Sequence, residues 1–283
     1  METRIARIAA TVLEPIHITC YFSPETAEHL TAIGLRPGRM VYYAGRAAPM
    51  GAVGPGVVTA TFYNFSPGPI AKNIPRAWTL ASPADVVAAR LAAVDAALVR
   101  LLGEAGCESP EVVELNELAR EATAACTPEG RPLYAAYADL EWPEKPYLAV
   151  WHAASLLREY RGGGHIAALV QAGIPGLDAL LLHIATGRSF TREFAQPSRG
   201  WTDQEWDTAA KGLVERGLID AENTITEAGL KLRSELEAAT DRAAMAPWEA
   251  LGEAKTNRLI ELGGQIRDQL ATAGAGPKGV FVR

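Results

Sequence analysis

Residues 200–230 read GWTDQEWDTAAKGLVERGLIDAENTITEAGL, and this stretch predicts the fold of the C-terminal half of the chain. Thr202 is placed to cap an amphipathic helix, because a threonine side chain accepts a hydrogen bond from a free backbone amide of the first helical turn. Gly217 provides the left-handed residue with which helices commonly end. Residues 219–225 place one isoleucine on each side of a tight polar turn, and Thr226 caps a second helix. We therefore expect a helix, a small β hairpin and another helix in succession.

This order of elements is that of a winged helix, in which the first of the two helices usually enters the major groove of DNA. Here that helix begins with Asp203, Glu205 and Asp207, and the hairpin adds Asp220 and Glu222. Affinity for DNA depends largely on Lys and Arg side chains that neutralise phosphates, so DNA binding is disfavoured. Acidic residues also stabilise a first helical turn through the helix dipole, which explains them without any function. If the protein does bind DNA, nearby basic residues would supply the contacts, namely Arg188, Arg192, Arg199 and Lys211.

The composition is that of a globular protein with an excess of acidic groups. The chain has 283 residues, of which 48% are hydrophobic and 21% are charged, and its formal net charge is -6. Such a balance gives no general attraction to nucleic acid or to an anionic membrane. The longest uncharged stretch (47–71) is interrupted by proline and glycine, so we expect no membrane span. Cys20, Cys107 and Cys126 form no C-x-x-C pattern, which is typical of reduced thiols in a cytoplasmic protein.

Helical patterns dominate the rest of the chain. Proline suits the first position of a helix, and Ser-Pro pairs that favour helix starts begin at positions 23, 66, 82 and 109. We predict a mostly α protein with a C-terminal winged helix (helix-turn-helix) and only a small β hairpin. An all-helical domain is expected at 1–142, and a winged-helix domain with C-terminal helices at 143–283.

A run of three glycines, Gly162-Gly163-Gly164, interrupts a helical pattern. The run predicts a break between a helix over 147–161 and a shorter helix over 165–172. Glycines before a helix can also hold an anion at the helix N-terminus, but no strand precedes them and the order G-x-G-x-x-G is absent. A hinge or a tight turn between two helices is the simpler interpretation.

Several longer segments carry a family resemblance. They are EPIHITCYF (14–22), YYAGRAAPMG (42–51), TATFYNFSP (59–67), VWHAASLLREYRGGGHIAALV (150–170), LLLHIATG (180–187) and RGW (199–201). With these segments the chain resembles an actinobacterial helix-turn-helix family over most of its length. The segment ERGLID…ITEAG within 215–229 separately resembles the MarR-type winged helix. The resemblance implies the fold and carries no activity over to this chain.

Histidine and arginine side chains of the second half are candidates for a binding site. His152, Arg158, His165 and His183 lie on three consecutive expected helices, so they can converge. Buried neutral imidazoles more often belong to a protein core than to a ligand site, and that alternative stays open for each of them. Beside a guanidinium group, imidazoles suit an anionic ligand or proton transfer.

An aromatic and polar group at 42–65 offers a second wall for such a site. Its aromatic residues can be core packing, or they can form an apolar pocket in which a few polar groups orient the ligand. Our leading interpretation is a small-molecule-binding protein with a pocket between the two halves and no strong affinity for DNA. The expected polar groups of this pocket are Arg46, Tyr63, Asn64, His152, Arg158, His165 and His183.

Two other functions stay open. A ligand-responsive, MarR-like transcriptional regulator would use the same pocket to control DNA binding, and an enzyme would use a pocket histidine as an acid–base group. Glu14 and His17 have the E-x-x-H spacing of di-iron bundles, but only one copy exists and no zinc pattern occurs, so no metal is expected. The sequence identifies neither a cofactor nor a catalytic residue, and a homodimer is compatible with it.

Overall fold

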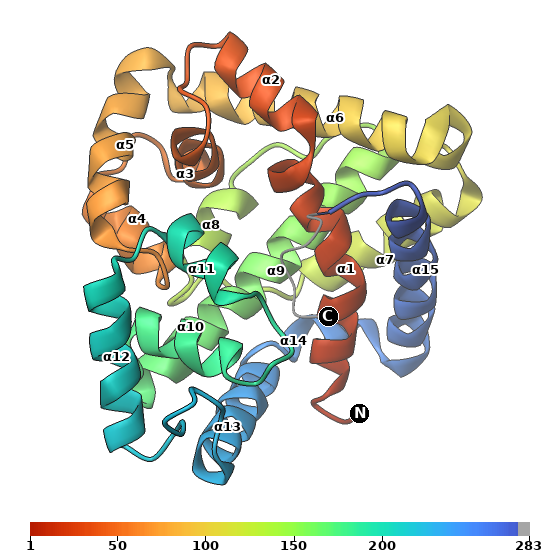
Figure 1. Cartoon of the computed structure of the whole chain (residues 1–283). Helices are drawn as coiled ribbons and strands as arrows, with labels where there is room; N and C mark the ends of the chain where they lie inside the picture. Colours follow the sequence, from red (N-terminus) through yellow and green to blue (C-terminus); the bar gives the residue numbers. More distant parts are fainter. Residues whose placement is uncertain (277–283) are drawn as a thin grey trace.

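The N-terminal half of the protein is built from helices of 7 to 25 residues, most of which begin at a proline. Figure 1 shows how they are arranged. The computed structural model describes residues 1–276. The missing N–H of proline costs nothing in the first turn, where backbone amides have no helical partner. The elements of this half are α1 (Ile5–Phe22), α2 (Pro24–Ala32), α3 (Arg39–Ala47), the 3-10 turn η1 (Ala48–Met50), α4 (Pro55–Phe62), α5 (Pro67–Leu80), α6 (Pro83–Cys107), α7 (Pro110–Thr123) and α8 (Pro132–Ala138).

The second half begins with the long helix α9, which crosses the centre of the molecule (Figure 1). Its buried side chains join three apolar cores: one with α1, α7 and α15, one with α3 to α5 and α8, and one with α10, α12 and α13. The elements of this half are α9 (Pro146–Gln171), α10 (Gly176–Ile184), α11 (Arg192–Arg199), α12 (Asp203–Glu215), α13 (Glu227–Ala243), α14 (Ala246–Leu251) and α15 (Glu253–Thr272).

The break expected at Gly162-Gly163-Gly164 is wrong, because α9 continues through all three glycines. The glycines allow close packing. A Cβ atom on Gly163 would lie 2.5 Å from Cγ of Arg131, and one on Gly164 would lie 2.8 Å from Cβ of Ala243 in α13. The side chains of neighbouring elements therefore occupy the space that side chains of these two residues would need.

Helix α12 is the helix that the sequence predicts to read a DNA groove, and its capping follows the sequence closely. The Thr202 hydroxyl accepts a hydrogen bond from the Glu205 amide (3.2 Å), and the Glu205 carboxylate accepts one from the Thr202 amide (2.9 Å). This reciprocal pair is a capping box and fixes where α12 begins. Gly200, at the turn between the helices, has the left-handed conformation with φ of 80°.

The expected β hairpin is reduced to one antiparallel bridge between Ile219 and Ile225; the part of the chain that the structure describes contains no strand. The Asp220 carboxylate accepts hydrogen bonds from the amides of Glu222 (3.0 Å) and Thr224 (2.7 Å). These bonds close the turn directly after Ile219, so no length of chain remains for a second pair. The all-α prediction is confirmed without the hairpin.

The C-terminal helices return to the N-terminal half. Helix α15 packs along α1 and against α7, and α14 also contacts α7. The division after residue 142 stays a prediction. Helices α14 and α15 follow this point in sequence, but in space they pack against helices of the N-terminal half. Between residues 1 and 276, no single helix is both long and apolar enough to cross a membrane. Taken together, α9 and α10 have the length and composition of a membrane span, but the pair is bent by 103°.

Candidate functional site

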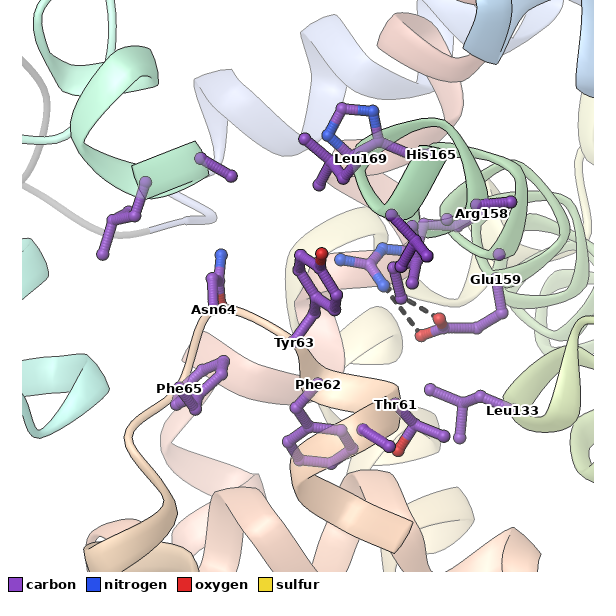
Figure 2. A pocket seen from close by; sticks show the side chains of 18 of the residues that line it. Thr61, Phe62, Tyr63, Asn64, Phe65, Leu133, Arg158, Glu159, His165 and Leu169 are labelled. Carbon is purple, nitrogen blue, oxygen red and sulfur yellow. Dashed lines mark hydrogen bonds and ion pairs between the residues drawn. The ribbon is translucent and has the colours of Figure 1, made fainter. Parts of the chain in front are cut away.

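A cavity of about 560 Å³ lies between the two halves of the molecule (Figure 2). One wall is the end of α4 with the loop that follows it, and α9 forms the opposite wall. Helices α3, α8, α10 and α13, the loop before α8 and the end of α11 also contribute to the lining. The structure brings six of the seven expected polar residues to this cavity: Arg46, Tyr63, Asn64, Arg158, His165 and His183.

His152, the seventh expected residue, is not among the residues that line the cavity. Its side chain is buried on another face of α9, where the imidazole meets the Trp142 ring edge to face at 4.8 Å between centroids. Burial, together with the positive charges of Arg90 and Arg120, lowers the pKa of His152 to about 4. The imidazole is therefore neutral at pH 7 and packs as a core residue.

A buried ion cluster forms one end of the cavity. Arg46 donates to both carboxylate oxygens of Glu159 (3.2 and 3.1 Å), and Nη1 of Arg158 donates to the same oxygens at 3.0 and 2.9 Å. Burial alone would raise the pKa of Glu159, but the two guanidinium groups outweigh it and hold the pKa at about 2. The carboxylate is thus ionised, and it compensates part of the charge of both arginines.

Arg199, the last residue of α11, reaches the cavity from the helix-turn-helix. Its guanidinium carbon lies 4.9 Å from the ring centroid of Phe190 and 5.2 Å from that of Phe65. Nη1 donates to the Ser198 hydroxyl (2.8 Å), while Nε is buried without a hydrogen-bond partner. Burial lowers the pKa of Arg199, and the charges of Arg46 and Arg158 act in the same direction. Sequence analysis gave Arg199 as a candidate phosphate contact, and the structure places it in the cavity wall.

The two histidines of the cavity have defined proton positions. The Thr240 hydroxyl donates to the Leu236 carbonyl (2.7 Å), so it accepts from Nδ1 of His165 (2.9 Å) and leaves a lone pair on Nε2 of that ring. Arg233 donates to Nδ1 of His183 (3.2 Å), so the His183 proton is on Nε2. The His183 side chain reaches the surface, but desolvation by the surrounding chain and the nearby Arg233 lower its pKa to about 4.

A strained residue joins the α4 wall to the second half. Tyr63 has φ of 56°, which is uncommon for a residue other than glycine. Its hydroxyl donates to the Ile174 carbonyl (2.8 Å), and a Cβ atom on Gly176 would lie only 1.8 Å from the Tyr63 carbonyl oxygen. The next residue, Asn64, accepts at its carbonyl from the Trp201 indole (2.9 Å). The wall and the helix-turn-helix are therefore docked on each other.

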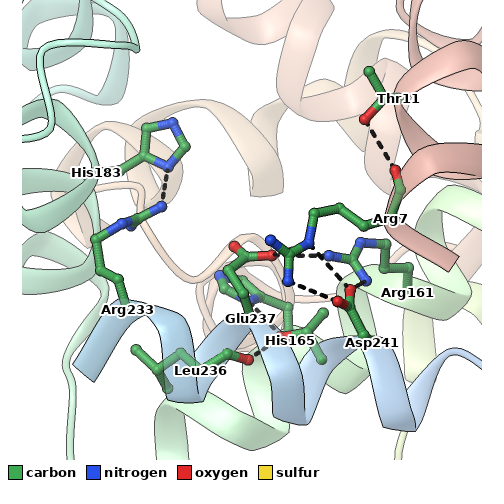
Figure 3. A network of polar contacts seen from close by, with 10 residues as sticks. Arg7, Thr11, Arg161, His165, His183, Arg233, Leu236, Glu237 and Asp241 are labelled. Atoms are coloured by element: carbon green, nitrogen blue, oxygen red, sulfur yellow. Dashed lines mark hydrogen bonds and ion pairs between the residues drawn. The ribbon is translucent and has the colours of Figure 1, made fainter. Parts of the chain in front are cut away.

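A second cavity, of about 670 Å³, lies on the other side of α9 against α1, α13 and α15. Arg7, Arg161 and Glu237, which line this second cavity, belong to a polar network (Figure 3). In it, Arg161 pairs with Glu237 (3.0 Å) and Asp241 (2.8 Å), and Arg7 pairs with Asp241 (2.7 Å). The cavities share part of their lining, namely Arg158, Gly162, His165, His183 and Glu237.

The outer face of α12 is acidic, as its sequence suggests. The side chains of Asp203 and Asp207 are 88% and 67% exposed. Arg192 pairs with Asp207 (3.2 Å) and approaches Asp203 (3.7 Å), and Lys211 approaches Glu215 at 3.9 Å. Two of the candidate phosphate contacts are thus already beside carboxylates. Arg188 is exposed in the loop before α11.

Sequence reasoning missed four charged residues of the cavity, Arg131, Glu159, Arg233 and Glu237. Glu159 follows Arg158 directly, and this pair of opposite charges in an apolar helix was the available signal. Arg233 and Glu237 lie one helical turn apart on α13, and only the fold shows that this face looks into the cavity.

The residues considered for metal binding make other contacts. The Ser155 hydroxyl accepts from Nδ1 of His17 (2.9 Å), since it donates to the Trp151 carbonyl, and Glu14 lies 3.9 Å from Arg158. Over residues 1–276, no group of three or more His, Cys, Asp or Glu side chains is placed to hold a metal ion.

Comparison with known families identifies a helix-turn-helix family. A helix-turn-helix family model matches residues 6–277, nearly the whole chain, and the chain therefore belongs to this family. No curated protein and no solved structure matches the chain. The actinobacterial and MarR-like details remain resemblances of the sequence.

Proposed function

We propose that this helix-turn-helix protein binds a small organic molecule in the cavity between its halves and has little affinity for DNA. The carrying observation is the 560 Å³ cavity itself, whose walls come from both halves and from the helix-turn-helix. Volumes of about 300–1,000 Å³ with apolar walls and a few convergent polar groups are typical of small-molecule sites.

The surface of α12 supports the second part of the proposal. The residues at its exposed start are acidic, and Arg192 already compensates two of them. DNA-binding proteins commonly make about six to ten phosphate contacts, and acidic residues in the groove-reading helix replace such contacts with repulsion. Weak binding that disappears at physiological salt is the expected behaviour.

A substitution that fills the cavity tests whether ligands bind there. Ala167 lines the cavity from an exposed position on α9, so a tryptophan there can enter the space without overpacking a core. In a thermal-shift screen of aromatic fragments, bound fragments should raise the Tm of the wild type by several degrees, since a ligand at about 100 times its Kd adds about 2.7 kcal/mol. The Ala167→Trp variant should lose these shifts.

The matched control is Ala88→Trp, at an exposed position of α6 that lines neither cavity. It should keep the fragment shifts of the wild type. Fragments that stabilise Ala167→Trp as strongly as the wild type would show that they bind elsewhere and would contradict the proposal.

A ligand-responsive regulator is the second candidate, and the docking of the α11–α12 turn favours it. The Ser66 amide donates to the Arg199 carbonyl (2.9 Å), so the cavity wall holds the turn that sets the direction of α12. A ligand that moves this wall would move α12. Under this alternative, anisotropy titrations with random and genomic duplexes would show sequence preference and a ligand-dependent Kd at about 150 mM salt. The acid–base enzyme stays a prediction.

A further inference from the structure

We infer that the ligand of this cavity is an apolar, ring-containing organic acid whose carboxylate is bound by Arg199 and faces Arg233 and His183. The inference rests on the proposed function, because it names the chemical class of the molecule that the cavity takes. The observations that support it are the charges and the hydrogen-bond donors around the cavity.

Positive charge exceeds negative charge in the lining. Two glutamates line the cavity, Glu159 and Glu237, and each already has two arginine partners. The cavity also has five arginines: Arg46, Arg131, Arg158, Arg199 and Arg233. Arg46 and Arg158 are paired with Glu159, whereas Arg131 donates to the main-chain carbonyls of Tyr160, Glu129 and Ala243.

Arg199 and Arg233 have no close ion pair, although Glu237 acts on Arg233 from a longer distance. Within residues 1–276, neither has a carboxylate oxygen within 4.0 Å of its guanidinium nitrogens. Arg199 is enclosed by aromatic rings and has a buried Nε without a partner. A buried donor without an acceptor is destabilising, and more so when it carries charge. A carboxylate bound at the part of the guanidinium group that reaches the cavity would compensate this charge, since the planar fork matches both of its oxygens.

The imidazole of His183 adds a neutral donor to the same region. Its Nδ1 accepts from Arg233, so Nε2 carries the proton and can donate to an anion. Desolvation lowers the pKa of His183, and the charges of Arg233 and Arg199, which line the same cavity, act in the same direction. Glu237, which lines the cavity and acts on Arg233 and His183, is itself paired with Arg161 and Arg7.

The remaining walls determine the body of the ligand. Phe65, Leu133, Leu169, Val170 and Leu180 line the cavity with apolar surface, and Figure 2 shows Phe65 and Leu169 on opposite sides of it. An aromatic or fused-ring body would bury this surface, while its carboxylate would lie near the α11 end. A sugar phosphate or a nucleotide would instead leave most of its polar groups unpaired.

The test compares an acid with its neutral isostere. In calorimetric titrations at pH 7.5, 1-naphthoate should bind to the wild type at least about tenfold more tightly than 1-naphthamide, a difference of about 1.4 kcal/mol. In Arg199→Gln the preference should fall below about twofold through loss of naphthoate affinity. The matched control Arg188→Gln removes an exposed arginine outside the cavity and should keep the wild-type preference.

The outcomes separate this inference from the proposed function. Equal affinities of acid and amide for the wild type, with binding lost in Ala167→Trp, would overturn the inference and leave the cavity as the binding site. Failure of both probes to bind the wild type at millimolar concentration would overturn the inference and count against the proposed function. If Arg199→Gln does not fold, Arg199→Lys keeps the charge without the fork and should lower the preference at least about threefold.

Discussion

Glu159 shows how one residue organises the cavity. Its carboxylate is 3% exposed and accepts hydrogen bonds from two arginines, so the cavity end is held by a fully bonded ion cluster. Removing one partner of a buried ion pair leaves uncompensated charge, which is far more costly than the pair itself is stabilising. Glu159 therefore governs both the stability of the fold and the position of Arg46 and Arg158.

Replacing Glu159 with glutamine should destabilise the protein by about 3–5 kcal/mol at pH 7, because the buried Arg46 loses its counter-charge and the partly exposed Arg158 loses its nearer one. Urea unfolding followed by circular dichroism measures the change. Glu144→Gln, at an exposed position before α9, should change the free energy of unfolding by less than about 0.5 kcal/mol. Equal stability of the two variants would contradict the ion cluster.

The pH dependence of this cluster follows from the depressed pKa of Glu159, about 2 against an ordinary value of 4.5. The stabilisation is present above pH 4.5 and is lost as the pH falls towards 2, because the unfolded state takes up the proton first. The difference in stability between wild type and Glu159→Gln should therefore narrow between pH 4.5 and 2. A constant difference across that range would refute the assignment.

The lowered pKa of His152 predicts a second loss of stability at acidic pH. Its pKa is about 4 in the folded protein against an ordinary 6.5, so protonation of the unfolded state removes stability as the pH falls from 6.5 to 4. The loss should reach about 3 kcal/mol. His152→Phe should flatten this part of the stability profile measured by urea unfolding, and an unchanged slope would contradict the buried neutral imidazole.

At the scale of elements, α9 explains why the glycine run misled the sequence prediction. Glycine lowers helix propensity by about 1 kcal/mol per residue, and a run of three therefore predicts a break. Tertiary packing overrides this tendency, because Arg131 and Ala243 lie against Gly163 and Gly164. The helix caps, in contrast, depend on neighbouring residues only, and Thr202 and Thr226 were correctly placed from sequence.

Two single substitutions within α9 should have opposite effects. Gly164→Ala should destabilise the protein by about 1–3 kcal/mol, because the new Cβ would lie 2.8 Å from that of Ala243. Gly162→Ala should stabilise it by about 0.5–1 kcal/mol, since its Cβ meets only ordinary contacts at 3.6 Å and beyond. Thermal unfolding measures the change in stability of both variants. Changes of the same sign would contradict the close packing of Gly164 against Ala243.

Helix α12 allows a test of electrostatic exclusion from DNA. The double variant Asp203→Asn, Asp207→Asn removes two exposed acids and releases Arg192 from them. Its affinity for a random 30-base-pair duplex at about 50 mM salt should rise at least about tenfold in anisotropy titrations. Glu141→Gln with Glu144→Gln makes the same change in net charge in the loop before α9. An equal gain in this control would mean that only net charge matters.

At the scale of the whole molecule, the cavity combines residues that are far apart in sequence. Arg46 and Tyr63 come from one half, and His183 and Arg233 from the other. Sequence analysis proposed six of the lining residues from their chemistry, since guanidinium, imidazole and aromatic groups are common in binding sites. It could not separate His152 from them, because which face of α9 meets the cavity depends on how α4, α10 and α13 pack around it.

The central claim is that a small molecule bound between the halves contacts both of them, and hydrogen exchange by mass spectrometry tests it most directly. The wild type is measured with and without the fragment that gives the largest Tm increase. We predict slower exchange in residues 60–65 of one half and in 180–199 of the other, with Ala167→Trp showing no change. Protection confined to one half, or to the exposed face of α12, would contradict a shared cavity as the binding site.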